Sequence, residues 1–65
     1  MQKDSEFNRK ILSMISKLGK VTTTTEIAER LGVSWNTAEK HLLELALENR
    51  IIRLKKAGVN LWILK

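Results

Sequence analysis

The sequence predicts a small, mainly α-helical α+β domain in which three helices are followed by one C-terminal β-hairpin. Two helical patterns meet within residues 31–34, which contain both a helix stop and a helix start. A third helical pattern precedes them, and the apolar residues change to a strand-like pattern after residue 50. The 65 residues are expected to form a single domain over residues 1–65.

The first helix is expected over residues 5–18. Its apolar side chains recur at helical spacing and form one stripe of Phe7, Ile11, Met14, Ile15 and Leu18. Asp4 or Ser5 can cap its N-terminus, and Gly19 follows its last residue, as glycine commonly does. Residues 20–22 then form a short extended link or a one-bridge strand.

The second helix is expected over residues 24–31. Thr23 and Glu26 have the spacing of a capping box, in which the threonine hydroxyl accepts a free backbone N–H and the glutamate side chain reaches back. Gly32 is expected to end this helix in the left-handed conformation. The second helix therefore has a local signal at each end.

The third helix is expected over residues 35–49, after Ser34 as its N-cap. Its inward face consists of Ala38, Leu42, Leu45 and Ala46, with His41 at the edge. The opposite side carries Asn36, Lys40, Leu43 and Leu47. Ala28 and Ala38 are small where the second and third helices are expected to cross, so we interpret both as scaffold residues.

The hairpin is expected over residues 51–64, with its tip at residues 57–59 and a positive φ at Gly58. Ile52 and Leu54 alternate with Arg53 and Lys55, so one face is expected to pack on the core and the other to be cationic. The hairpin therefore adds a positively charged surface to the three helices.

The charge balance favours an anionic partner. Twelve Lys and Arg against seven Asp and Glu give a net charge of +5. A membrane surface would call for one strongly basic amphipathic helix, whereas the positive charge here is spread over several elements. No apolar run approaches the roughly 20 residues that span a bilayer, and the polar N-terminus does not resemble a signal peptide. Nucleic acid is therefore favoured over membrane, with a cytoplasmic, nucleoid-associated location.

The residue inventory argues against an enzyme. The chain has no cysteine and one histidine, so it offers no thiolate nucleophile and no zinc ligand set. Its serines have no plausible histidine–acid partner, and its three glycines stand at separate chain reversals rather than in a phosphate-binding loop. We expect no catalytic residues, no metal, no cofactor and no small-molecule ligand.

The order of elements resembles the winged helix–turn–helix family of prokaryotic (bacterial and archaeal) transcription regulators. The segment 25–42, Thr-Glu-Ile-Ala-Glu-Arg-Leu-Gly-Val-Ser-Trp-Asn-Thr-Ala-Glu-Lys-His-Leu, is similar to that family's helix–turn–helix signature. The matching features are Ala28, Gly32, Val33, Ser34, the Asn36-Thr37-Ala38 step and His41-Leu42. The resemblance covers residues 5–64. It implies that the third helix enters the major groove of double-stranded DNA and that the hairpin, the family's wing, lies on the adjacent backbone.

The candidate DNA-binding residues follow from this resemblance and from base-edge chemistry. Asparagine can pair with adenine, lysine with guanine or phosphate, and a threonine methyl group with thymine. The candidates are Trp35, Asn36, Thr37 and Lys40 on the third helix, Thr24 and Thr25 at the start of the second, and Arg53, Lys55 and Lys56 on the wing.

Several of these candidates have a second interpretation. Trp35 either lies exposed against DNA or folds back over the second helix as part of the core. Thr24 and Thr25 either donate to phosphate or simply cap the helix. The wing cations either contact phosphate or protect an edge strand from aggregation.

Two other functions remain open at this stage. One is a nucleic-acid module of low or unusual specificity, as in replication, recombination, RNA binding or repeat-DNA binding. The other is a winged helix that binds proteins, which Glu39 and Glu44 beside Lys40 slightly favour. Leu12, Leu43 and Leu47 suggest excess apolar surface, which would form a homodimer interface or be covered by the wing or Trp62.

Overall fold

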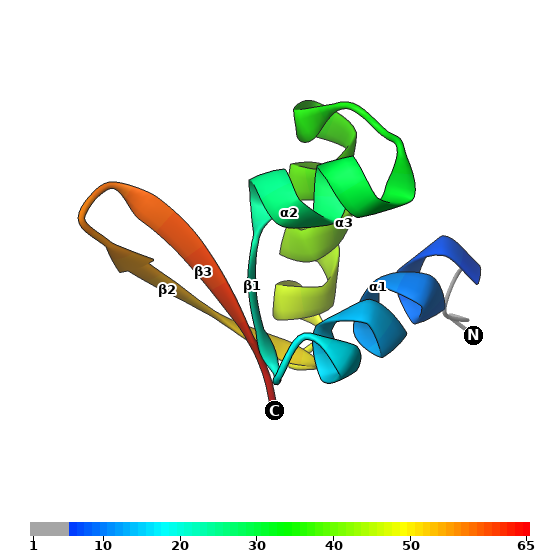
Figure 1. The fold of residues 1–65 in the computed structure, drawn as a ribbon. Helices are drawn as coiled ribbons and strands as arrows, with labels where there is room; N and C mark the ends of the chain where they lie inside the picture. Colours follow the sequence, from blue (N-terminus) through cyan, green and yellow to red (C-terminus); the bar gives the residue numbers. More distant parts are fainter. Residues whose placement is uncertain (1–5) are drawn as a thin grey trace.

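The computed structural model describes residues 6–65, which form three helices and one three-stranded antiparallel sheet (Figure 1). The predicted α+β class, with three helices and a C-terminal hairpin, is confirmed. The expected cap at Asp4 or Ser5 lies outside the described residues. In chain order the elements are α1 (Glu6–Lys17), β1 (Val21–Thr23), α2 (Thr24–Leu31), α3 (Trp35–Leu47), β2 (Ile51–Lys56) and β3 (Val59–Leu64).

The turn between α2 and α3 is built from local signals. Gly32 adopts φ +69, and its N–H and that of Val33 both donate to the carbonyl of Ala28. Ser34 then caps α3, and its hydroxyl accepts from the N–H of Thr37 at 3.2 Å. The left-handed glycine and the serine cap were both predicted, and the turn has these features.

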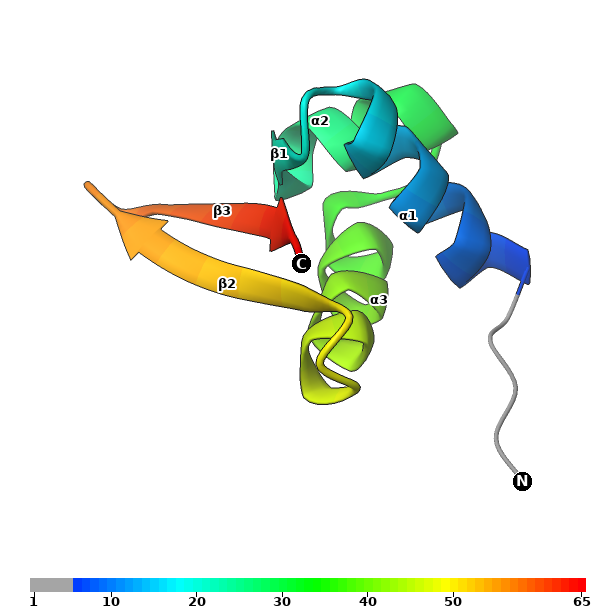
Figure 2. The same cartoon turned by 90° about the horizontal axis from the view of Figure 1, so that it is seen from below.

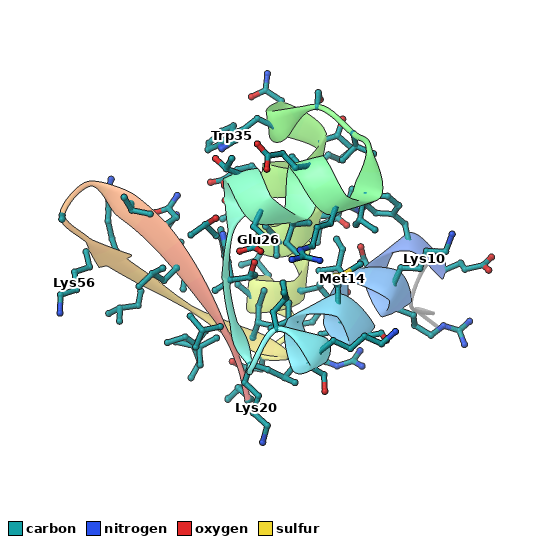
Figure 3. The ribbon with its side chains drawn as sticks, in the orientation of Figure 1. Lys10, Met14, Lys20, Glu26, Trp35 and Lys56 are labelled. Carbon is teal, nitrogen blue, oxygen red and sulfur yellow. The ribbon has the colours of Figure 1, made fainter. Side chains whose placement is uncertain are left out.

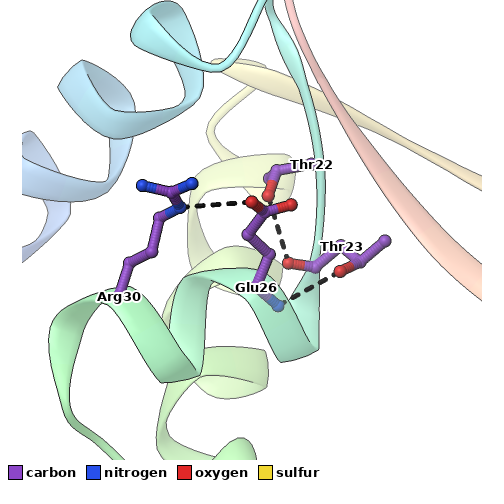
Figure 4. Close-up of polar contacts among 4 residues, drawn as sticks. All are labelled: Thr22, Thr23, Glu26 and Arg30. Carbon is purple, nitrogen blue, oxygen red and sulfur yellow. Dashed lines mark hydrogen bonds and ion pairs between the residues drawn. The ribbon is translucent and has the colours of Figure 1, made fainter.

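The capping box of α2 forms only in part (Figure 4). The Thr23 hydroxyl accepts from the N–H of Glu26 at 3.1 Å, as predicted. The carboxylate of Glu26 does not make the predicted return contact and instead accepts from Arg30 Nε at 3.1 Å, one helical turn further along. The nearby arginine offers this carboxylate a charged donor, which is a stronger partner than a neutral backbone N–H.

The end of α3 differs from the expected end by two residues, because the helix stops at Leu47. Asn49 takes a left-handed conformation with φ +63, and the N–H of Arg50 donates to the carbonyl of Leu45 at 2.9 Å. Asparagine tolerates this conformation better than most residues with a side chain. It therefore closes α3 much as glycine closes α2.

The core lies where the helices meet one another and the sheet. Its largest fully buried side chains are Trp62, Ile11, Ile15, Ile27, Leu42 and Leu45. Ala28 and Ala38 are also buried, on α2 and α3 respectively. In both views the β2–β3 hairpin, which we call the wing, projects away from the helices on the side opposite α1 (Figure 1, Figure 2).

Of the two predicted alternatives, the strand is the one that forms, over residues 21–23 and with three paired residues instead of one bridge. The strand order is β1-β3-β2, and Val21, Thr22 and Thr23 pair with Ile63, Trp62 and Leu61. The edge of β3 that faces away from β2 has backbone groups that need hydrogen-bond partners, and β1 supplies them. The start of α2 is thereby attached directly to the wing.

The predicted assignment of the two hairpin faces was wrong. Arg53 pairs with Trp62 and Lys55 pairs with Asn60, so these four side chains share a face. Trp62 is fully buried, which turns this face toward the helices. Ile52 is 48% exposed on the opposite face. Alternation shows which residues share a face, but the burial of the large indole decides which face packs.

The wing turn is shorter than predicted. Ala57 and Gly58 have φ +53 and +79, and Val59 already belongs to β3. Two consecutive positive φ angles are typical of a two-residue turn whose twist matches that of the strands. The turn therefore uses Ala57 in a conformation that glycine or asparagine adopts more readily.

Candidate nucleic-acid interface

A cleft of about 290 Å³ lies between the wing and the start of α2 and α3. It is lined by Thr23, Thr24, Thr25, Trp35, Lys55, Gly58, Val59 and Asn60. Trp35 projects beside the start of α2, and Lys56 lies near the wing tip (Figure 3). The fold thus brings residues from three separate parts of the chain to one side of the molecule.

The exposed side of α3 continues from this cleft. Asn36, Thr37 and Lys40 are all exposed. Thr37 also accepts from the hydroxyl of Ser34 at 3.0 Å, so part of its hydrogen-bonding capacity is used locally. Trp35 is 47% exposed and lines the cleft, which places its ring outside the core.

The three predicted wing cations are exposed but do not lie together. Arg53 and Lys55 share the face that turns toward the helices, and Lys55 lines the cleft. Lys56 pairs with Val59 on the opposite face. Of the three, Lys55 is therefore the one that the fold brings to the start of α2.

Thr24 occupies a different environment from the exposed donor that the sequence predicts. It is only 3% exposed. Its hydroxyl donates to Glu39 Oε1 at 2.7 Å and accepts from Trp62 Nε1 at 2.8 Å. Both contacts lie within the protein, whereas the neighbouring Thr25 is exposed at the cleft.

Glu39 joins this contact to the wing. Its second carboxylate oxygen accepts from Asn60 Nδ2 at 3.3 Å. Sequence reasoning missed the roles of Glu39, Asn60 and Trp62, because these partners lie 15 to 38 residues apart and no local pattern links them. We call Thr24, Glu39, Asn60 and Trp62 the polar network.

His41 makes a second polar contact between helices. Its Nδ1 lies 2.8 Å from Asn8 Oδ1 and 3.4 Å from Glu44 Oε1. Its ring packs against Phe7 with centroids 4.6 Å apart. Asn8 is buried on α1, so this histidine ties α1 to α3 and lies away from the cleft.

The leucines predicted to form a homodimer interface fall into different environments. Leu12 is half-buried and packs against the core. Leu47 is 87% exposed, and Leu43 is also exposed. Neither the wing nor Trp62 covers Leu47. The outer face of the sheet adds further exposed apolar side chains, namely Val21, Ile52, Leu54 and Val59.

Within residues 6–65, no helix has the length and apolar character needed to cross a bilayer. In the same range, no three acidic, histidine or cysteine side chains group so that they could hold a metal ion.

Comparisons with known proteins identify the family and support the fold. Residues 4–52 match a family described as winged helix-turn-helix DNA-binding. The hypothetical protein PyrSV_gp04 from Pyrobaculum spherical virus is 30% identical, with a TM-score of 0.83 over 91% of this chain and 37% of that one. A mutant of ZitR from Lactococcus lactis is 25% identical, with a TM-score of 0.82 over 98% of this chain and 44% of that one. The chain thus spans less than half the length of either structure. No curated protein sequence matches it significantly.

Proposed function

The chain belongs to the winged helix–turn–helix DNA-binding family, and we propose that it is a transcription regulator that reads double-stranded DNA with α3 in the major groove. The wing lies on the adjacent backbone. The regulatory role is supported by the resemblance of residues 25–42 to the signature of prokaryotic transcription regulators. The binding unit is the single domain predicted over residues 1–65, acting at the nucleoid.

One observation carries this proposal. The cleft brings Lys55 of the wing and Thr25 of α2 to the same side as the exposed start of α3. A duplex whose major groove receives Asn36 and Lys40 then has a phosphate strand beside Lys55. Asn36 and Lys40 carry the base contacts, while Lys55 and Thr25 position the backbone.

The test is an amide chemical-shift titration of labelled protein with a short mixed-sequence DNA duplex, at low and moderate salt. We expect shifts concentrated on residues 34–40 and 53–60 that fade as salt rises, because phosphate contacts release counterions. A Lys10→Ala variant should give the same pattern of shifts and serves as the control, since Lys10 lies on α1, away from the wing (Figure 3). If α3 shows no shifts even at low salt, the protein does not read DNA in this way.

Competition with unrelated duplexes and with RNA separates a specific regulator from a module of low specificity. A regulator binds at least about 10³-fold more tightly to its own site than to other DNA. A flat preference across duplexes, with the same shift pattern, would favour the low-specificity module.

We further propose that the protein forms a homodimer through the outer face of the sheet rather than through Leu12, Leu43 and Leu47, since Leu12 packs against the core of its own chain. Antiparallel sheets that face water usually carry polar residues on that side, whereas this face carries Val21, Ile52 and Leu54. Pairing there leaves the exposed side of α3 free for DNA. Only a few exposed apolar side chains make up this face, whereas specific association buries about 1,000 Å² or more, so we expect a weak dimer.

Sedimentation at several concentrations tests the dimer. Wild type should shift toward dimer as concentration rises, and Ile52→Lys should stay monomeric. Leu47→Lys is the matched control, because it removes an exposed leucine on α3 instead. A monomer at all concentrations, or loss of the dimer only with Leu47→Lys, would refute this interface.

A further inference from the structure

The polar network links three elements that DNA binding must hold in register. Thr24 stands at the start of α2, Glu39 on α3, and Asn60 and Trp62 on β3. The carboxylate of Glu39 uses both oxygens, one for Thr24 at 2.7 Å and one for Asn60 at 3.3 Å. Glu39 therefore joins α3 to both the start of α2 and the wing by side-chain hydrogen bonds.

The position of Asn60 allows its hydrogen bond with Glu39 to set the orientation of the wing. Residues 52–59 are all exposed, so they gain little orientation from packing. Asn60 directly follows them and reaches Glu39 with its side-chain amide. The Asn60–Glu39 hydrogen bond thus attaches the wing to α3 near the exposed tip, at the position where Asn60 pairs with Lys55.

Glu39 carries a negative charge close to the proposed DNA surface. Glu39 comes directly before Lys40 and lies one helical turn after Trp35 and Asn36, close to the proposed DNA surface. A carboxylate there repels phosphate. If Glu39 only repelled phosphate, its removal would tighten DNA binding. If Glu39 instead holds the wing in place, its removal weakens DNA binding, so the direction of the change in affinity separates the two roles.

We propose that Glu39 is a positioning residue that holds the wing at a set angle to α3, so that both can contact one duplex. This inference rests on the proposed function. Glu39 touches no base or phosphate in this scheme and acts through Asn60 and Thr24. The network takes the place of apolar packing that the exposed wing lacks.

The first test compares two substitutions that remove the same charge. Glu39→Ala deletes both hydrogen bonds, and we expect duplex binding to weaken by about tenfold, the effect of one charge-assisted hydrogen bond. Glu39→Gln keeps an oxygen for Thr24. Its amide can donate to Asn60 Oδ1, which is buried and has no hydrogen-bond partner in the described part of the chain. Rotation of the Asn60 side-chain amide by a half turn brings Oδ1 to the glutamine amide. We therefore expect Glu39→Gln to bind duplex DNA as well as wild type or more tightly.

The second test restores the contact at constant charge. Asn60→Asp places two carboxylates against each other and should weaken binding by at least tenfold. In the double variant Glu39→Gln with Asn60→Asp, the glutamine amide donates to the new carboxylate. Its net charge equals that of wild type and exceeds that of Asn60→Asp by one. Recovery of the wing orientation without DNA therefore reports the contact, and recovery of affinity should accompany it.

Each variant is measured in two ways. Fluorescence anisotropy with a mixed-sequence duplex gives the affinity, and residual dipolar couplings of wing and α3 amides give their relative orientation without DNA. We expect Glu39→Ala and Asn60→Asp to change the orientation, and Glu39→Gln and the double variant to preserve it. If Glu39→Ala does not fold, Glu39→Gln, Asn60→Asp and the double variant still complete the comparison.

The outcomes separate this inference from the proposed function. If Glu39→Ala binds as tightly as wild type or more tightly and keeps the wing orientation, the positioning role is wrong. The same holds if the double variant binds no better than Asn60→Asp alone. If wild type itself does not bind duplex DNA, the proposed function fails, and the couplings still decide whether Glu39 orients the wing.

Discussion

Replacing Thr24 with valine removes one hydroxyl from the interior while keeping the branched shape of the side chain. That hydroxyl accepts from the indole N–H of Trp62 at 2.8 Å and donates to Glu39 at 2.7 Å. Trp62 is fully buried, so its N–H cannot turn to water. An unsatisfied buried donor costs about 1–3 kcal/mol.

The loss at Glu39 is smaller, because this carboxylate is only half-buried and water can replace the hydroxyl. The total expected destabilisation of Thr24→Val is therefore about 2–3 kcal/mol. For a domain of this size such a change lowers Tm by roughly 8–24 °C. A total stability of about 3–10 kcal/mol makes this a large fraction of the whole.

Thermal and urea unfolding followed by circular dichroism measure this prediction. Thr24→Ser is the matched control, since it keeps the hydroxyl and loses one methyl group, and it should cost about 1 kcal/mol. The reasoning is refuted if Thr24→Val lies within about 0.5 kcal/mol of wild type, the usual range of a neutral surface change. It is also refuted if the serine variant is as unstable as the valine variant.

Three further predictions concern the turns and the wing. Gly32→Ala should lose about 1–2 kcal/mol in unfolding measurements, because φ is +69 while a Cβ meets nothing within 4 Å; equal stability would contradict a left-handed cap. Ala57→Asn should raise stability by about 0.5–1 kcal/mol, since asparagine suits the positive φ in a two-residue turn; a lower Tm would count against that turn. Lys55→Ala should weaken duplex binding and reduce the salt slope by about one, whereas Lys10→Ala leaves both unchanged; an unaltered slope would remove Lys55 from the phosphate contacts.

Both ends of α2 and the start of α3 could be predicted because their chemistry is local. The contacts of Thr23 with Glu26, of Gly32 with Ala28 and of Ser34 with Thr37 join residues within four positions of one another. Local geometry has few alternatives, so residue type and spacing are enough. Glu26 is an exception to this local predictability, since Arg30 on the next helical turn competed for its carboxylate.

The exposed side of α3 was also predictable. A helix with Ala38, Leu42 and Leu45 on one side must turn Asn36 and Lys40 to the other. Helical period and the burial of apolar residues therefore select the candidate base-reading residues. Whether the Trp35 ring joins the core does not follow from period, and only its surroundings place it at the cleft.

The hairpin needed the tertiary structure because strand alternation allows two opposite assignments. The burial of Trp62 decided that Arg53 and Lys55 turn toward the helices, and that Ile52 turns away. Likewise, β1 became a strand because the free edge of β3 lay beside it. The sequence left a link and a short strand both open here, because a three-residue segment does not show which strand lies beside it.

The polar network depended entirely on the fold. Thr24 looked like a surface residue at a helix start, and it became buried because Trp62, 38 residues later, packs over it with its N–H directed at the hydroxyl. Glu39 likewise gained Asn60 as a partner only when the wing came to lie beside α3. Periodicity and caps describe how a chain behaves over a few residues, whereas these contacts arise from the close packing of distant segments.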